Sequence, residues 1–496
     1  YLFEANLRYD GSSRFAPDSR WGVFPSFSGA WRISEEAFME STRDLVDNLK
    51  LRVSWGKLGN NGIGNDKLGE YDYQAVYGKV NYTFGNTQAS GLAATKIANT
   101  LLRWESTSVA NFGLDVAMLN NRLTAEIDAY HKLTDGILYV PSIYETMGNK
   151  TAPSTNIAEV TNNGMEITLG WKDKVGGVNY SVSGNFAYNH NEVTKFKGQL
   201  KRGWEVDEKG NKVYKSNIGD VGDADGAKYL LEGKQINEFY VLGLHHGTEA
   251  HFNNDGTPNI KGGPRDGMIR TEEDLKWVQA MMDAGYKFYP SQGVGKTKIW
   301  YGDYIYADKN GDGIYGNSND KDFTGTSATP KFNFGLQLAA SWKNFDLSMN
   351  FAGAAGFDLY FNQYGYTRST IIDGGGVSTM IAKDHYFYNE GDNSVPYQNN
   401  INAKYPRLKK NSDSQNGEIS TAYLFKGDYL KMKNLSFGYT LPANITTKIF
   451  AQSVRVYFSA ENLFTITGFP GQDPELGATP EYTSVRQFAF GTNITF

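Results

Sequence analysis

The side chains best suited to metal chemistry lie in one short segment, DKNGDGI from Asp308 to Ile314, with Asp320 a few residues further on. Oxygen ligands at positions 1, 3 and 5, a glycine at position 6 and a main-chain carbonyl at position 7 are what a calcium-binding loop requires. Asn319 replaces the usual Glu at position 12, and no apolar helical pattern flanks the segment, so an EF-hand is not expected. We expect a structural Ca²⁺ in a freestanding loop with these ligands: Asp308, Asn310, Asp312, the Ile314 carbonyl and Asp320. A plain turn rich in Asp, Asn and Gly is the alternative.

Two further patterns could do chemistry but are weak. The run GVGKT from Gly293 resembles the end of a phosphate-binding loop, but Pro290 stands where the first glycine belongs. The histidines at 245, 246 and 251 could bind a transition metal only if a carboxylate joined them, and a solvated loop is the simpler interpretation. The sequence contains no nucleophile elbow, zinc-protease helix or dinucleotide fingerprint. No enzyme is therefore predicted.

Aromatic side chains beside Asn, Asp and Gln form a second group of candidate binding residues. A sugar ring offers an apolar face for stacking and hydroxyl groups for hydrogen bonds, which suits flat rings next to polar groups. The candidate substrate contacts are Trp204, Trp300, Tyr301, Tyr304, Tyr360 and Tyr364. Packing of the long loops against each other is the alternative role for each ring.

The elements that must position these loops are strands with one apolar face. Leu123 and Ile127, for example, alternate with Glu126 and Asp128, which is a period of two. Twelve such segments occur, near residues 1–9, 26–33, 48–56, 107–118, 122–131, 162–172, 178–190, 331–342, 345–351, 429–439, 453–462 and 486–496. The apolar parity changes near Lys433–Asn434, which predicts a bulge. The segment from Thr271 to Tyr286 predicts one short helix inside the longest loop.

The connections between these segments alternate in length, and every odd-numbered connection is expected to be longer than the one after it. The longest two span 191–330 and 352–428. A transmembrane barrel has short turns at one end and long loops at the other, and its strands need ~9–11 residues to cross the bilayer. Strands of a soluble sandwich, the alternative, are usually ~5–6 residues long. We therefore predict an all-β transmembrane antiparallel barrel with long extracellular loops, a lipid-facing apolar surface and a wet polar interior.

Composition agrees with a large β architecture. Of the 496 residues, 14 % are aromatic, 55 are glycine and none is cysteine, which excludes disulfides and thiolate metal sites. The formal net charge of −5 gives no basic footprint for nucleic acid. Mean hydropathy is −0.50, and no apolar stretch reaches the ~18 residues of a membrane helix.

Several longer motifs resemble those of one family over the whole chain. They include RYDGSSRFAPDSRWGVFPSFSGAWRISEEAF from Arg8, WESTSVANFGLDVAML from Trp104, DKNGDGIY from Asp308, YLKMKNLSFGYTLP from Tyr429 and VRVYFSAENLFTITGFPGQDPE from Val454. The chain resembles the SusC-like (RagA-like) TonB-dependent outer-membrane transporters of the Bacteroidota.

The resemblance implies a 22-stranded, plugged barrel of which residues 1–496 are the C-terminal part, with the plug domain and the TonB-contacting segment outside this chain. It also implies active import of oligosaccharides, or of oligopeptides, together with a SusD-like surface lipoprotein and the TonB complex. The expected location is the outer membrane, with the long loops extracellular and the C-terminus periplasmic, and no organic cofactor is expected. A passive pore of twelve strands and a secreted carbohydrate-binding or hydrolysing β protein are the alternatives.

Overall fold

The computed structural model describes residues 1–62, 69–141, 146, 150, 152–372, 374–387, 400–411, 414–479 and 482–496. Its main feature is one antiparallel sheet of twelve strands in which each strand pairs with its neighbours along the chain. The strands are β1 (Leu2–Gly11), β2 (Trp21–Arg32), β3 (Val46–Asn60), β6 (Glu105–Met118), β7 (Leu123–Tyr139), β8 (Thr155–Val175), β9 (Val178–Lys195), β18 (Phe332–Trp342), β19 (Phe345–Ala355), β24 (Tyr429–Thr440), β25 (Ser453–Thr467) and β26 (Gln487–Thr495). All twelve predicted strands are confirmed.

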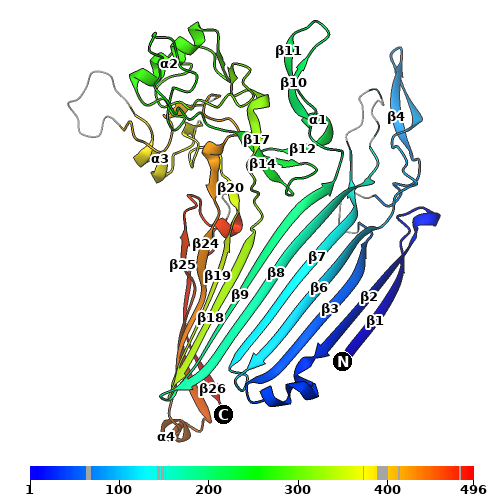
Figure 1. Cartoon of the computed structure of the whole chain (residues 1–496), viewed down its shortest axis with the longest axis vertical. Coiled ribbons are helices and arrows are strands. Elements are labelled where there is room, and N and C mark those ends of the chain that lie inside the picture. Colours follow the sequence, from blue (N-terminus) through cyan, green and yellow to red (C-terminus); the bar gives the residue numbers. More distant parts are fainter. Residues whose placement is uncertain are drawn as a thin grey trace.

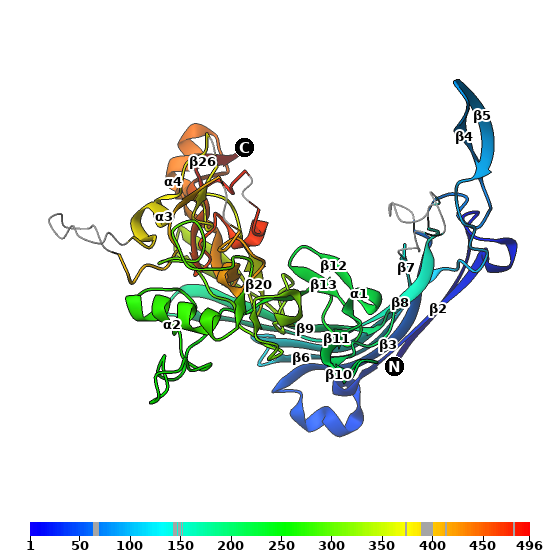
Figure 2. The same cartoon turned by 90° about the horizontal axis from the view of Figure 1, so that it is seen from above.

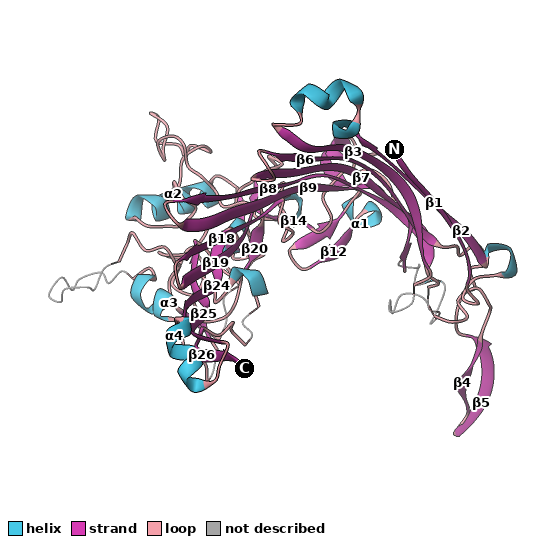
Figure 3. Ribbon diagram, turned by 90° about the horizontal axis from the view of Figure 1, so that it is seen from below, coloured by secondary structure: helices cyan, strands magenta, loops and turns pink. Residues whose placement is uncertain are grey.

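The sheet curves strongly but does not close. Seen along the strands, it bends into a wide arc with β1 at one edge and β26 at the other (Figure 3). In the described part of the chain, β1 pairs only with β2 within this sheet and β26 only with β25. The twelve strands therefore form a wall with two free edges, and a pore closed by these twelve strands alone is not what the structure shows.

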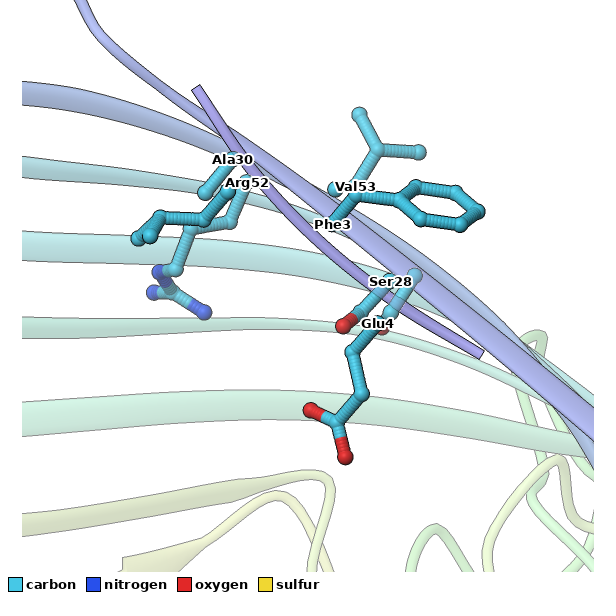
Figure 4. A pocket seen from close by; sticks show the side chains of 9 residues that line it. Phe3, Glu4, Ser28, Ala30, Arg52 and Val53 are labelled. Carbon is cyan, nitrogen blue, oxygen red and sulfur yellow. The ribbon is translucent and has the colours of Figure 1, made fainter. Parts of the chain in front are cut away.

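The two faces of the wall differ in chemistry, as the alternation predicts. One row of apolar side chains crosses the sheet in register and contains Leu51, Leu114, Ile127, Ile167, Phe186 and Phe334. On the opposite face Arg52 links three strands, since its guanidinium lies 2.7 Å from Asp115 Oδ1 and donates to Asp128 Oδ2 at 2.9 Å. Figure 4 shows the same alternation beside the free edge, where Phe3 and Val53 point to one side and Glu4 and Arg52 to the other.

Local details also agree with the sequence. β24 is out of register with both neighbours between Met432 and Asn434, so Lys433 is the extra residue of the predicted bulge. The predicted helix is α2 (Glu272–Asp283), which begins with a capping box between Thr271 and Asp274. Its apolar side packs into the core of the loops.

One expectation about the connections is wrong. Residues 12–20 join β1 to β2 and residues 33–45 join β2 to β3, so the first connection is shorter than the second. The pairing of β1 with β2 continues to Gly11 and Trp21, beyond the apolar alternation, and this shortens the first loop. The second connection contains the 3₁₀ helices Ile33–Glu35 and Ala37–Thr42, which lengthen it.

The remaining elements belong mostly to the long connections, which gather at one end of the sheet, whereas the short turns and both termini lie at the other end (Figure 1). The other helices are α1 (Ile218–Val221), α3 (Thr379–Asp384) and α4 (Ala443–Thr446), with 3₁₀ helices at Pro17–Ser19, Ser318–Asp320, Thr421–Tyr423, Thr447–Ile449 and Pro474–Leu476. One small sheet has four strands, β12 (Asp223–Asp225), β13 (Lys228–Leu230), β14 (Glu238–Leu242) and β17 (Lys321–Phe323). The other small strands form pairs, which are β4 (Tyr77–Phe84) with β5 (Thr87–Ala94), β10 (Arg202–Val206) with β11 (Lys212–Ser216), β15 (Lys287–Phe288) with β16 (Ile314–Tyr315), β20 (Asp358–Tyr360) with β23 (Leu424–Lys426), and β21 (Thr370–Ile371) with β22 (Lys409–Lys410). The β4–β5 hairpin projects away from the rest (Figure 2).

The longest loop has a hydrophobic core, to which Tyr386 and Ala403 of the second-longest loop also contribute. Trp277, Val278 and Met281 of α2 are fully buried against Phe288 and Tyr315 of the β15–β16 pair. This packing makes the loop region a folded unit on top of the sheet. Among the described residues, every helix is too short or too polar to cross a membrane.

Candidate functional site in the long loops

The predicted calcium loop closes around the carboxylate of Asp308. Its Oδ1 accepts hydrogen bonds from the main-chain N–H groups of Gly311 and Asp312, at 2.8 and 3.2 Å, and its Oδ2 accepts one from Gly313 at 2.9 Å. Gly311 and Gly313 have φ angles of 73° and 79°, which is left-handed backbone that glycine adopts without strain. The structure thus shows a tight turn around the Asp308 carboxylate, and calcium binding in this turn stays a prediction.

Asn310 and Asp312 face each other within this loop. The Asn310 amide donates to Asp312 Oδ2 at 3.0 Å, and the Asn317 amide donates to the same oxygen at 2.9 Å. The Ile314 carbonyl accepts a longer bond from the Asn317 amide, at 3.3 Å. The Asp312 carboxylate keeps unused lone pairs, because an ionised carboxyl group has about four acceptor positions.

Asp320 stabilises the loop through hydrogen bonds to main-chain N–H groups. Its Oδ1 accepts from Lys309 N at 2.8 Å and its Oδ2 from Gly316 N and Asn317 N, each at 2.9 Å. Burial raises the pKa of Asp320 to about 6, although these N–H groups act against the rise, and the nearby Asp308 carboxylate adds to it. Both carboxylate oxygens of Asp320 already accept hydrogen bonds from main-chain N–H groups. Asp320 is therefore better suited to stabilising the turn than to coordinating a cation directly.

The donor set fits a calcium ion in part. Asp308, Asn310, Asp312 and the Ile314 carbonyl offer the oxygen ligands that Ca²⁺ prefers, on a loop of the required length. Within the described residues no group of three or more His, Cys, Asp or Glu side chains is arranged to hold a metal. Any cation here would rely on two carboxylates together with amide, carbonyl and water oxygens.

Each of the three histidines of the same region contacts a different partner. His245 stacks on Trp277 and contacts the Gly262 carbonyl at 2.7 Å, while His251 contacts Asp274 Oδ1 at 2.8 Å. His246 contacts the Arg265 carbonyl at 3.0 Å. Because their partners are different, the three histidines are interpreted as structural residues and not as one metal site. Burial lowers the pKa of His245.

The six aromatic candidates divide by burial. Tyr301 and Tyr304 are only 7 % and 6 % exposed and belong to the core of the loop, and Tyr301 also lines the cavity beside Trp300. Trp300 is half-buried and lines a cavity of about 410 Å³ together with Tyr386, Phe387 and Arg407. The rings that are more accessible to a sugar are Trp204, Trp300, Tyr360 and Tyr364.

The other three rings lie on separate elements. Trp204 is 45 % exposed on β10, and its indole N–H donates to the Asn310 carbonyl of the calcium loop at 3.0 Å. Tyr364 is 46 % exposed and has the Arg368 guanidinium 4.4 Å above its ring. Tyr360 is half-buried in β20, where its hydroxyl accepts from the Asn362 amide at 3.2 Å.

Asp303, which no pattern in the sequence indicated, joins the two longest loops. Asp303 is completely buried and accepts from Arg407 Nε and Nη2 at 2.8 Å each, from Asn416 Nδ2 at 2.9 Å, and lies 3.1 Å from Lys409 Nζ. Its partners are more than a hundred residues away in the sequence, and Asp303 itself stands in a run of loop residues. No local pattern could have indicated the contact.

A second missed feature is a small cavity beside the calcium loop, of about 270 Å³, to which Arg202, Tyr214, Tyr240 and Lys321 contribute. A larger hollow of about 550 Å³ lies along the free edge of β1. Figure 4 shows that its lining comes from both faces of the sheet, with Phe3 on one side and Ser28 and Ala30 on the other. This hollow follows the unpaired edge, and its polar lining residues Glu4, Ser28, Arg52 and Ser54 lie on the polar face of the sheet.

Comparisons with known proteins agree with the fold. The family model described as "TonB dependent receptor-like, beta-barrel" matches residues 1–264. TonB-dependent receptor SusC of Bacteroides thetaiotaomicron is 27 % identical over 506 residues, covering 100 % of this chain and 42 % of that protein. TonB-dependent receptor P39 of Formosa agariphila is 27 % identical over 530 residues, covering 100 % and 45 %.

Solved structures give the same result. The structure described as that of the RagAB peptide transporter superimposes with a TM-score of 0.70 at 23 % identity, and the match covers 100 % of this chain and 45 % of that chain. The likeness at this identity is one of fold. The chain spans less than half the length of the curated relatives that it matches.

Proposed function

Because the chain belongs to the family of TonB-dependent receptor-like β-barrels, we propose that it forms part of the barrel wall of an outer-membrane importer. The observation that carries this proposal is the sheet itself. One of its faces has an apolar row that crosses the strands in register, and the other face is polar and carries paired charges. Lipid on one side and water on the other would satisfy both faces.

The whole transporter would be energised through TonB and would take up oligosaccharides or oligopeptides. The long connections would lie outside the cell, with the short turns and Phe496 in the periplasm. Loops longer than ~12–15 residues usually have a function of their own. The loops 191–330 and 352–428 would therefore contact a SusD-like surface lipoprotein and the cargo. The chain would act in transport and not as an enzyme.

Calcium would have a structural role in this arrangement. A cation held by Asp308, Asn310, Asp312 and the Ile314 carbonyl would fix the loop whose Asn310 carbonyl accepts the Trp204 indole N–H. The metal would thereby hold the β10–β11 hairpin in place. Its charge would also offset the two carboxylates that face the loop centre.

Uptake in living cells tests the proposed function. Cells that produce the full-length protein are given a panel of labelled oligosaccharides and oligopeptides, with and without an intact TonB gene. We expect uptake of at least one class that stops when TonB or the surface lipoprotein is removed. Equal uptake in all strains would contradict the proposal.

Single ring variants then test the loops. Replacing Trp300, Tyr360 or Tyr364 by Ala should lower binding and uptake while the amount of barrel in the membrane stays the same, because stacking is lost but the lipid-facing rows are intact. The matched control is Tyr289→Ala, since Tyr289 is also an exposed aromatic residue, at 46 %, in the same loop region. Full retention of binding in all three variants would assign these rings to loop packing.

A further inference from the structure

The 270 Å³ cavity beside the calcium loop has walls from two elements that the fold brings together. Arg202 and Tyr214 come from the β10–β11 hairpin, and Tyr229 and Tyr240 come from the small sheet of β12, β13, β14 and β17. Lys321, the first residue of β17, completes the lining. Pockets for drug-sized ligands hold roughly 300–1,000 Å³, so this one has room for a single compact unit.

The aromatic walls form two groups, one on the small sheet and one on the hairpin. The rings of Tyr229 and Tyr240 lie 5.1 Å apart, and Tyr240 packs on Phe323 at 4.8 Å. Tyr214 meets Trp204 edge-on at 5.8 Å across the hairpin. These flat apolar surfaces suit a ring or a short aliphatic segment of a ligand.

The polar groups of the cavity are only partly used. The Tyr229 hydroxyl donates to the Ile218 carbonyl at 3.2 Å. In contrast, the hydroxyls of Tyr214 and Tyr240 have no hydrogen bond to the part of the chain that the structure describes, and the Lys321 ammonium group forms no ion pair there. Tyr240 is 8 % exposed, so its ring is held by packing and its free hydroxyl belongs to the cavity.

The charge around these groups is positive on the side of Arg202 and Lys321. Arg202 Nη2 lies 2.7 Å from Asp322 Oδ1, and Lys309 Nζ lies 2.7 Å from Asp322 Oδ2. Although burial alone would raise the pKa of Asp322, the hydrogen bonds from Lys309 and Arg202 hold it at about 2. Burial, and then the charge of Asp223, raise the pKa of Tyr229, and Asp223 itself accepts a hydrogen bond from the Tyr139 hydroxyl at 2.6 Å. The carboxylate of Asp322 thus faces two cations, Arg202 and Lys309, and the Lys321 ammonium group is left for a ligand.

We propose that this cavity binds one carboxylate-bearing unit of the cargo, with its apolar part on the tyrosine rings and its carboxylate on the Lys321 ammonium group and the hydroxyls of Tyr214 and Tyr240. An acidic sugar and the carboxylate of a peptide share this chemistry. The inference rests on the proposed function for its role in transport. The binding itself needs no transport.

The site is tied to the calcium loop through its walls. The indole of Trp204 donates to the Asn310 carbonyl, and Arg202 also donates to the Lys321 carbonyl at 3.3 Å. Lys321 follows directly after Asp320, whose oxygens fix the preceding turn. The hairpin, the cavity and the loop therefore form one unit.

Titration calorimetry on the full-length protein in detergent tests the inference. The probes are galacturonate and the dipeptide Gly-Gly, and their neutral counterparts are galactose and Gly-Gly amide, which tell the two sources of carboxylate apart. We expect at least one acidic probe to bind about tenfold or more tightly than its neutral counterpart, because hydrogen bonds to a charged group are the strong ones. Absence of binding for both acidic probes, or equal binding of the neutral ones, would overturn the inference.

Two variants locate the binding. Lys321→Met removes the charge, and Tyr240→Phe removes only a hydroxyl that makes no hydrogen bond to the described residues. Each variant should therefore bind the acidic probe about tenfold more weakly while the fold is kept. The matched control is Lys209→Met in the exposed turn of the β10–β11 hairpin, and this variant should bind the probe as the wild type does. Unchanged binding in Lys321→Met and Tyr240→Phe would place the probe elsewhere. Absence of probe binding by the wild-type protein, with intact TonB-dependent uptake, would overturn this inference alone. Probe binding by a wild-type protein that shows no TonB-dependent uptake would overturn only the proposed function.

Discussion

At the scale of single residues, Asp303 is the group on which the arrangement of the two longest loops depends. It lies in the segment 191–330, and its partners Arg407, Lys409 and Asn416 lie in 352–428. A buried carboxylate that faces two cations leaves both of them uncompensated when it is removed. The loops should then lose their common geometry, although the strands below are unaffected.

Replacing Asp303 by Ala should therefore open the loop region. We expect a local cost of about 3–5 kcal/mol, the usual effect of breaking a buried ion pair. Hydrogen exchange of residues near Trp300 and Arg407 should rise strongly, with normal exchange in β7 and β8. Glu205→Ala is the control, because the Glu205–Lys215 pair is about 60 % exposed on both sides and should matter little. Equal exchange in both variants would contradict this role of Asp303.

Asp320 gives the calcium proposal a pH dependence with a definite sign. Its folded pKa of about 6 is above the ordinary value of 3.8, so the native loop binds this proton more tightly than the unfolded chain does. Protonation stabilises the loop fully below pH 3.8, and the stabilisation is lost as the pH rises through 6. A cation near Asp308 and Asp320 would replace the proton at higher pH.

We therefore expect millimolar calcium to protect the loop 308–320 from proteolysis strongly at pH 7.5 and only weakly at pH 5, compared with protein in a chelator. Asp312→Asn, which removes one carboxylate ligand, should lose most of the protection at pH 7.5. Glu249→Gln, an exposed acid in the same loop region, is the control. The same protection at both pH values, or none at pH 7.5, would speak against a calcium site.

At the scale of elements, the strands were predictable because each carries its own pattern. Leu123, Ile127 and their polar neighbours mark β7 without reference to the rest of the chain, and Thr271 with Asp274 marks the start of α2. The first third of β8, residues 155–161, was not predicted, since main-chain pairing continues there without an apolar alternation. Short pairs such as β15–β16 could not be found, because Lys287 and Ile314 meet only through the fold of the loop.

The same limit applies to the candidate site. The predicted calcium ligands are close in sequence, and in the structure Asp308, Asn310 and Asp312 are linked by hydrogen bonds within one turn. Burial of Tyr301 and Tyr304 could not be predicted, because it depends on α2 and on Tyr386 from a distant segment. Ring type alone does not distinguish a core residue from a binding residue.

Substitutions in β18 test which face of the wall meets lipid. Leu336 lies on the apolar face beside Phe351, and Gln337 lies on the other face beside Asn350. Leu336→Arg should lower the free energy of folding into lipid vesicles by about 2–4 kcal/mol if it lies near the bilayer midplane. Gln337→Arg is the matched control and should cost little. Similar losses in the two variants would be incompatible with the assigned faces.

At the scale of the whole molecule, the wall has a direction and two faces, and the proposed transport depends on both. Its long loops share one end and its short turns the other (Figure 1). Its edges β1 and β26 carry exposed side chains such as Phe3 and Phe490, at 80 % and 84 %. Pairing of both edges with further strands would complete the barrel, as the resemblance to 22-stranded transporters implies.

The measurement that tests the account most directly is a single-cysteine scan along β7, because this chain has no cysteine of its own. A polarity-sensitive dye is attached in turn at 123, 125, 127 and 129, and at 124, 126 and 128, in full-length protein folded into vesicles. We predict that brominated lipid quenches the dye at the odd positions and that aqueous iodide quenches it at the even ones, because successive side chains point to opposite faces. Quenching by iodide at every position, or by lipid at none, would contradict a wall that separates lipid from water.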